Sequence, residues 1–290
     1  MKVKKWTLGE WLSEWYETYK KPYLRPNSVR NIEQVIRLHI PEDLKYKRLT
    51  EITAHEVEKA LAPLGKSRTR VYTRQVLYSA FDKAFKLGFV KRNVMEAVEN
   101  VRYQKQKSKA LKIDEQREFL ARLENSRYKW LMLFYLLTGV RRGEALTLRT
   151  EDINYVENLI YIRGTKTEES ERYILLTPEV NAVLRAQLEQ NERERREKKQ
   201  GRFHQAEESI VFPFGLEQAS REFKKLCPNH HLHELRHTFV TRCAESGVNV
   251  TVCQQLVGHS TADMTLNVYT HVMDEFKRKE AKKFQLFPTL

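Results

Sequence analysis

Residues 138–148 read TGVRRGEALTL and directly follow the most apolar stretch of the chain, WLMLFYLL at 130–137. The apolar stretch predicts a buried helix that ends at Gly139, and a second helix begins within about three residues. Arg141 and Arg142 then lie on a tight turn at the edge of a buried helix. Two interpretations stay open: the cations simply favour a helix C-terminus, or they are gathered to bind an anion.

The residues around this stretch predict a second domain that starts near Leu111 and is mostly helical. Two short β-rich runs flank a polar segment at 164–171, which is typical of a hairpin. The chain after 199 reads as mostly helical through Phe284. The expected elements are helices over 113–124, 127–138 and 178–199 and strands over 159–163 and 172–176.

The first hundred residues predict a compact bundle of helices. Thr7 with Glu10, and Thr53 with Glu56, have the spacing of a capping box, so each threonine marks a helix start. A break is expected at 26–28, where the sequence is Pro-Asn-Ser. Further helices are expected over 29–40, 69–87 and 91–98.

The positive charge of the chain is concentrated in its first part. Of 290 residues, 1–110 hold 24 Lys and Arg against 12 Asp and Glu, whereas 111–290 hold 28 against 26. A basic part joined to a near-neutral part indicates a polyanion-binding module attached to something else. Residues 102–112 (RYQKQKSKALK) read as a basic linker, which serves either solubility or contact with a phosphate backbone.

Composition excludes several classes of protein. The longest apolar run is far shorter than the roughly 20 residues needed to span a bilayer, and the N-terminus lacks a secretory signal. Three cysteines without CxxC spacing disfavour a disulfide framework or a Cys-based zinc site and suit a reducing cytoplasm. The sequence contains neither GxxxxGK[ST] nor GxGxxG, so a bound nucleotide as energy source is not expected.

Three further clusters carry polar side chains that could bind a ligand or take part in a reaction. Lys166 falls at the expected hairpin tip, where a lysine is usually only solvated. In HLHELRHT at 231–238, His233, Arg236 and His237 share one helix face, which favours an anion site. Zinc is the alternative for the two histidines, although the arginine between them opposes a metal. The last cluster is LVGHS at 256–260, with Tyr269 ten residues after His259.

Taken together, these groups are the parts of a metal-free phosphoryl transfer. Guanidinium groups match the charge on the oxygens of a phosphodiester transition state. A tyrosine can attack phosphorus and form a covalent ester. A lysine or histidine can protonate the departing sugar oxygen.

In order and spacing, TGVRRGEALTL, TKT, HELRH, LVGHS and the final tyrosine resemble the tyrosine recombinase family of the phage-integrase type. The resemblance implies a mostly α fold with a small antiparallel sheet (α+β), and two domains that form a C-shaped clamp on DNA. It implies a helical core-type DNA-binding domain at 1–101, the linker at 102–112, a catalytic domain at 113–272, and a tail at 273–290 that docks on a neighbouring protomer.

The resemblance also implies roles for individual residues. Arg141 and Arg236 would hold the scissile phosphate, and Lys166 would be the acid for the 5′-hydroxyl. His233 would take the tyrosyl proton, His259 would hydrogen-bond a phosphate oxygen, and Tyr269 would form a 3′-phosphotyrosine link. The supporting and DNA-contacting residues implied are Glu144, His237, Arg102, Lys105, Lys107 and Lys109.

The implied function is site-specific recombination that integrates or excises a phage or mobile element, with no cofactor and no metal. The implied partners are double-stranded DNA, three further copies of the chain in a tetramer on paired sites, and an accessory excision factor, in the nucleoid of a bacterial cytoplasm. A type IB topoisomerase uses similar residues and is the alternative within this chemistry. A non-catalytic DNA-binding protein and a metal-dependent nuclease or transposase are the alternatives from other classes.

Overall fold

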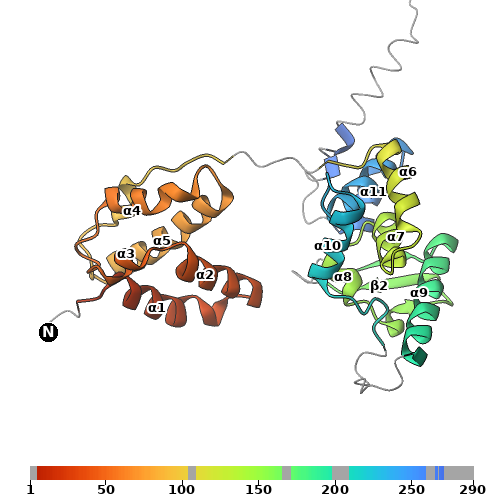
Figure 1. Cartoon of the computed structure of the whole chain (residues 1–290), viewed down its shortest axis with the longest axis horizontal. Coiled ribbons are helices and arrows are strands. Elements are labelled where there is room, and N and C mark those ends of the chain that lie inside the picture. The colour runs from red at the N-terminus through yellow and green to blue at the C-terminus, as the bar shows by residue number, and fades with distance from the viewer. Residues whose placement is uncertain are drawn as a thin grey trace, which may run out of the picture. The chain divides into compact units, whose positions relative to one another are not determined.

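The computed structural model describes residues 5–103, 109–164, 171–197, 209–258, 265–266 and 268–270. It divides into two compact units, Met1–Gln106 and Lys107–Leu290, and the division falls inside the basic segment 102–112 (Figure 1). The expected hairpin tip and most of the residues after 258 lie outside the described residues.

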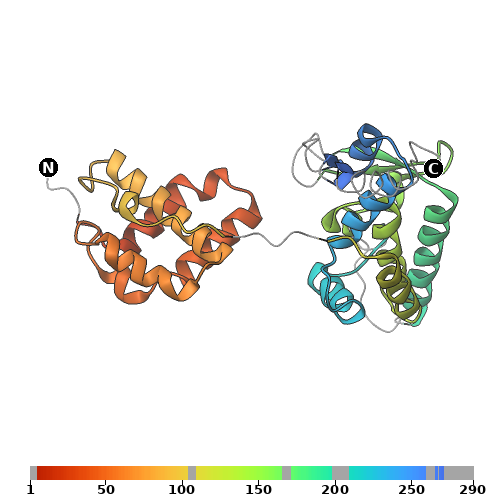
Figure 2. The ribbon, with the colours of Figure 1, turned by 90° about the horizontal axis from the view of Figure 1, so that it is seen from above.

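The N-terminal unit is a bundle of helices around a tryptophan-rich core. Trp11 and Trp15 are almost completely buried, and the Trp11 indole donates a hydrogen bond to the Ala80 carbonyl (2.9 Å). The long helix α5 packs against α1, α2 and α4. The elements are α1 (Leu8–Tyr19), η1 (Lys21–Tyr23), α2 (Pro26–Leu38), α3 (Glu42–Tyr46), α4 (Ala54–Leu61), η2 (Ala62–Leu64), α5 (Arg68–Lys86) and η3 (Val94–Ala97) (Figure 2).

Both expected capping boxes are present, at Thr7 and at Thr53. The break expected at 26–28 is wrong, because Pro26 opens helix α2 instead of interrupting the chain. A proline at the first helical position loses no hydrogen bond and has the right φ. The helix expected over 91–98 is only the single 3₁₀ turn η3, and α3 was not expected.

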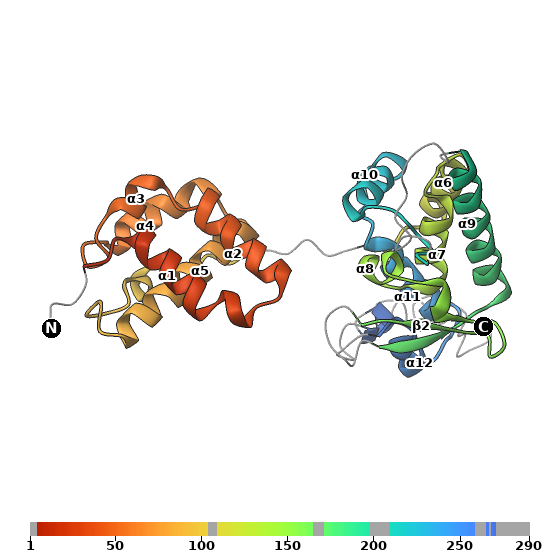
Figure 3. The ribbon, with the colours of Figure 1, turned by 90° about the horizontal axis from the view of Figure 1, so that it is seen from below.

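The C-terminal unit is built around the apolar helix α7 (Lys129–Thr138), which packs against α9 (Pro178–Glu197) and α11 (Glu234–Glu245). Helix α6 (Ile113–Leu123) and helix α8 (Arg142–Leu146) both contact α10 (Leu216–Leu226). The 3₁₀ turn η4 (Thr150–Asp152) leads into the sheet. Helix α12 (Val250–Val257) contacts the sheet at β3 (Figure 3).

The sheet is antiparallel, in the order β1 (Ile153–Asn154), β2 (Leu159–Ile162), β3 (Arg172–Leu175). Ile160 pairs with Ile174, and both point into the core. The expected hairpin strands are therefore present, and β1 is an additional strand of two residues. The fold is mostly α with a small antiparallel sheet, as predicted. Among the described residues, no helix combines the length and the apolar character needed to cross a membrane.

Candidate active site

The turn between α7 and α8 positions Arg141. Gly139 ends α7 with φ +62°, the left-handed region that favours glycine, and a Cβ at this position would overlap the Phe239 ring. Arg141 follows in an extended conformation as the residue that precedes α8. The tight turn predicted from the sequence is present, and from it the Arg141 side chain reaches the Gly258 carbonyl.

The Glu144 carboxylate is completely buried between two arginines. It accepts hydrogen bonds from the Arg141 backbone N–H (2.7 Å) and Nη1 (2.6 Å), and from Arg172 Nη2 (2.9 Å) and Nη1 (3.3 Å). Burial alone would raise the pKa of Glu144, but the hydrogen bonds and positive charges of Arg172 and Arg141 outweigh it and lower that pKa. The carboxylate is therefore ionised at neutral pH and fixes both guanidinium groups.

The two arginines also bind the C-terminal end of α12. Arg172 Nε donates to the Leu256 carbonyl (2.7 Å), and Arg141 Nη2 donates to the Gly258 carbonyl. Carbonyls at a helix C-terminus have no partner within the helix and attract cations. The end of α12, where the LVGHS motif begins, is thus tied to Glu144 through two guanidinium groups.

Arg236 lies in the first half of α11 and is 4% exposed. Its Nη1 donates to the Gly139 carbonyl (2.7 Å), whereas its Nη2 has no hydrogen-bond partner among the described residues. Burial lowers the pKa of Arg236 to about 9, and the nearby charges of Arg141 and Arg172 add to the effect. Arg141, Arg172 and Arg236 thus place three positive charges around the single negative charge of Glu144. An anion bound at Arg236 would neutralise the excess positive charge.

His233 immediately precedes α11, and its ring lies edge-on to that of His237, with centroids 5.4 Å apart. The pKa of His233 is lowered to about 4, although the side chain keeps access to solvent. Desolvation by the surrounding protein is the main cause, and the positive charges of His237, Arg236, Arg142 and Arg141 add to it. His233 is therefore neutral at pH 7 and able to accept a proton. Within the part of the chain that the structure describes, no three His, Cys, Asp or Glu side chains come together as a metal site.

Tyr269 is 6% exposed and packs in a small cluster with Cys243 of α11 and Cys253 of α12. Its hydroxyl makes no hydrogen bond of good geometry within the described residues. Burial raises the pKa of Tyr269, and the neighbouring Cys253 thiol raises it further. A hydrogen bond with Cys243 holds the pKa of Cys253 below its ordinary value, and the neighbouring Tyr269 hydroxyl and Arg236 charge add to this.

The structure thus brings Arg141, Glu144, His233, Arg236 and His237 into one neighbourhood, and Cys253 is near both Arg236 and Tyr269. Of the remaining predicted residues, Lys166, His259, Lys105 and Lys107 lie outside the described residues, and Arg102 and Lys109 are exposed.

Sequence reasoning missed Arg172. It stands at the first position of a predicted strand, in no motif, and its side chain is only 8% exposed. No signal in the sequence pointed to its pairing with Glu144.

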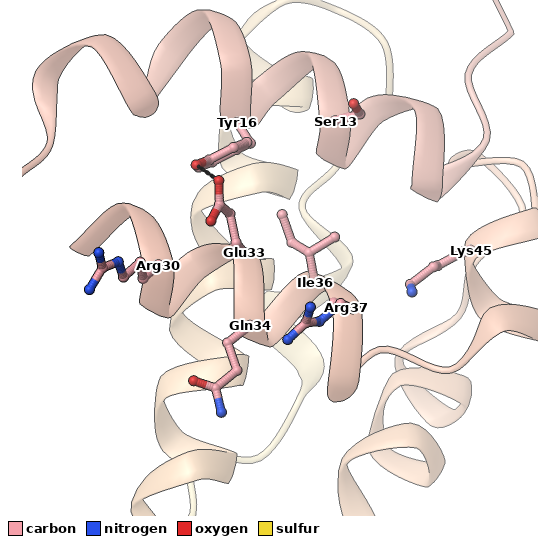
Figure 4. A pocket seen from close by; sticks show the side chains of 8 residues that line it. All are labelled: Ser13, Tyr16, Arg30, Glu33, Gln34, Ile36, Arg37 and Lys45. Carbon is pink, nitrogen blue, oxygen red and sulfur yellow. Dashed lines mark hydrogen bonds between the residues drawn. The ribbon is translucent and has the colours of Figure 1, made fainter. Parts of the chain in front are cut away.

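The N-terminal unit carries a cleft of about 600 Å³ between α1, α2 and α3, and three of its lining residues are cationic. Its one carboxylate, Glu33, accepts a hydrogen bond from the Tyr16 hydroxyl (2.6 Å), while three cationic side chains extend from the ribbon around it (Figure 4). The residues that line the cleft are Ser13, Tyr16, Arg30, Glu33, Gln34, Ile36, Arg37 and Lys45.

Comparison with known proteins agrees with this architecture. Residues 107–275 match the model of the phage integrase family, and residues 7–64 match the phage integrase N-terminal SAM-like domain. The chain belongs to the phage integrase family of tyrosine recombinases. It is an enzyme of site-specific recombination that cuts and rejoins DNA.

Individual relatives are distant in sequence, and a solved structure of low identity shares the fold. Tyrosine recombinase XerA of Pyrococcus horikoshii is 26% identical over 82% of this chain and 82% of its own. The ICEBs1 integrase of Bacillus subtilis is 22% identical over 89% of this chain and 77% of its own. A lambda integrase tetramer bound to a Holliday junction has a TM-score of 0.73 and 21% identity, and the match covers 91% of this chain and 78% of that one.

Proposed function

We propose that Tyr269 attacks the scissile phosphate of DNA while Arg141 and Arg236 hold two of its non-bridging oxygens. The observation that carries this proposal is the buried Arg236 guanidinium, whose Nη2 has no partner among the described residues. A buried donor without an acceptor is costly, so such a group favours an anionic ligand. The fixed position of Arg141 on Glu144 supplies a second preorganised donor at the same place.

The transfer balances without an added reactant. The Tyr269 oxygen forms a bond to phosphorus, its proton passes to the neutral His233 imidazole, and the bond from phosphorus to the 5′-oxygen breaks. The departing oxygen takes a proton from Lys166, and His259 hydrogen-bonds a phosphate oxygen; both roles rest on position in the sequence motifs. The product is a 3′-phosphotyrosine link, and the reverse reaction with a new 5′-hydroxyl rejoins the strand.

The remaining residues support this chemistry. Glu144 holds Arg141, and His237 packs edge-on against His233. In the structure the Tyr269 side chain is buried against Cys243 and Cys253, and the pKa of its hydroxyl is raised. Cleavage therefore requires the hydroxyl to leave the cysteine cluster and to lose its proton to a base.

We further propose that residues 1–101 grip the DNA backbone and that the linker 102–112 follows it, with Arg102, Lys105, Lys107 and Lys109 facing phosphates. The excess of Lys and Arg in this part supports the proposal, as do Arg30 and Arg37 beside the cleft. Residues 113–272 would form the catalytic domain.

The assembly is proposed by analogy with lambda integrase, which forms a tetramer on a Holliday junction. Four copies of this chain would act on paired sites, each with residues 273–290 docked on a neighbour, and an accessory excision factor would set the direction. The resemblance to a mobile-element integrase supports integration and excision of such an element in the nucleoid of a bacterial cell.

The test is a suicide DNA substrate that traps the covalent adduct, resolved on a denaturing gel. Tyr269→Phe should abolish the adduct and leave DNA affinity within about twofold, because it removes only the attacking oxygen. Arg141→Ala and Arg236→Ala should each lower cleavage by the ~10²–10³ typical of losing one fixed transition-state donor. An adduct that persists in Tyr269→Phe would refute the nucleophile assignment.

A further inference from the structure

The end of the interdomain segment is bound along one face of helix α11. The Lys109 backbone N–H donates to Glu234 Oε1 (3.1 Å), and the Leu111 N–H donates to Thr238 Oγ1 (2.9 Å). Arg242 Nη2 donates to the Leu111 carbonyl (2.7 Å). Glu234, Thr238 and Arg242 recur every four residues and form one stripe on the helix, which we call the linker clamp.

Glu234 and Thr238 of the linker clamp are buried, and Arg242 is partly exposed. Thr238 is 0% exposed and Leu111 is 1% exposed, so the Leu111 N–H depends on the Thr238 hydroxyl for its hydrogen bond. The second oxygen of Glu234 accepts from the His231 N–H (3.1 Å) and faces His230 Nδ1 (2.8 Å). The clamp thus also fixes the turn that leads into α11.

The side of the same helix opposite the clamp carries Arg236. At about 100° per residue, Arg236 lies about 200° around the helix from Glu234, whereas His233 and His237 lie about 100° and about 60° from Glu234, on the flank that joins the two sides. A rotation or slide of α11 that loosened the clamp would move Arg236 and His233 by the same rigid motion. Displacements of about 1 Å at catalytic groups can lower rates by about 10²-fold.

We propose that Glu234, Thr238 and Arg242 are positioning residues, which hold the catalytic face of α11 in register by binding the backbone of residues 109–111. The proposal rests on the roles proposed above for Arg236 and His233. It makes the attachment of the linker to α11 a requirement for cleavage and not only for folding.

The test is single-turnover cleavage of a suicide DNA substrate by the full chain at saturating DNA, with DNA affinity measured separately. Thr238→Val keeps the shape of the side chain and removes the acceptor. We expect the cleavage rate to fall about tenfold while Kd changes by less than about twofold. Thr238→Ser should restore most of the rate, and Thr241→Val on the same helix should leave it unchanged. Tryptic cleavage after Lys109 reports whether the clamp has opened.

An opened clamp with a normal cleavage rate per folded molecule overturns the proposal, as does a Thr238→Ser variant as slow as Thr238→Val. If Thr238→Val does not fold, Arg242→Gln tests the same stripe through a partly exposed side chain, with the same tenfold expectation. Tyr269→Phe in the same assay separates the two proposals. A covalent adduct formed by Tyr269→Phe refutes the proposed function. If Tyr269→Phe forms no adduct and Thr238→Val cleaves at the wild-type rate, only the positioning role is refuted.

Discussion

Replacing Glu144 by glutamine should destabilise the C-terminal unit strongly. The carboxylate accepts four hydrogen bonds, two from Arg141 and two from Arg172, and its side chain is 0% exposed. Each carboxylate oxygen accepts one hydrogen bond from Arg141 and one from Arg172, so a glutamine NH₂ group in place of either oxygen removes two charge-assisted hydrogen bonds. At about 1.5–3 kcal/mol each, the free energy of unfolding falls by about 3–6 kcal/mol. Breaking a buried ion pair costs a similar ~3–5 kcal/mol.

The chain offers separate reporters for its two units. All three cysteines lie buried in the C-terminal unit, whereas three of the four tryptophans, Trp6, Trp11 and Trp15, lie in the N-terminal unit. Labelling of the thiols in increasing urea therefore follows unfolding of the C-terminal unit, and tryptophan fluorescence mainly follows the other. With a slope of about 2 kcal/mol per molar urea, a loss of about 4 kcal/mol lowers the thiol midpoint by about 2 M.

The matched control is Glu118→Gln, which removes an exposed pair with Arg122 on α6 and should cost no more than about 0.5 kcal/mol. Because the pKa of Glu144 is lowered in the folded state, its contribution is complete above its unfolded pKa, near 4.5. That contribution disappears as the pH falls through the lower folded pKa, and the gap between wild type and Glu144→Gln should close there. A thiol midpoint that matches the Glu118→Gln control at pH 7 would refute the account of Glu144 as the fixed anchor of both arginines.

Two further predictions use the same thiol assay. The pKa of His233 is about 4 in the folded chain and about 6.5 in the unfolded chain, so between these pH values only the unfolded chain binds the proton. Acidification from pH 6.5 towards 4 should therefore lower the free energy of unfolding of wild type more than that of His233→Gln. Equal pH profiles of the two proteins would contradict the lowered pKa. Gly139→Ala should cost about 2–4 kcal/mol, because it combines a left-handed φ with overlap on Phe239. The control Gly247→Ala has a similar φ (+73°) and open space, and should cost only about 1 kcal/mol; equal losses would show that the Phe239 contact is unimportant.

The helices with strong local signals were predictable from the sequence. The capping boxes at Thr7 and Thr53 and the apolar run before Gly139 each fix an element by interactions within a few residues. Pro26 misled the prediction because a proline that opens a helix and a proline that breaks one look alike without the structure. Strand β1 is two residues long and exists only through its pairing with β2, so it leaves no periodicity to detect.

The candidate site also contains residues with a local sequence signal and residues without one. That Arg141, His233 and Arg236 lie near one another could be expected because each stands in a short motif that carries the family resemblance; their roles stay a prediction. Arg172 could not be expected beside them, since its burial and its bond to Glu144 join residues 28 positions apart. The contacts of residues 109–111 with α11 span more than 120 positions and likewise have no signature in the local sequence.

The bond from Arg141 Nη2 to the Gly258 carbonyl has a consequence for how substrate enters. One N–H of Arg141, which we propose binds the scissile phosphate, is already occupied by the protein's own backbone, so an arriving phosphate oxygen either uses another N–H of the guanidinium or competes with a carbonyl for this one. Where the phosphate takes this donor, the exchange is favourable at the arginine, because a bond to a charged acceptor replaces a bond to a neutral carbonyl. Such an exchange also frees the residue that immediately precedes His259. Because Arg172 still donates to the Leu256 carbonyl (2.7 Å), the exchange would loosen only the last residue of the helix end and leave α12 itself attached.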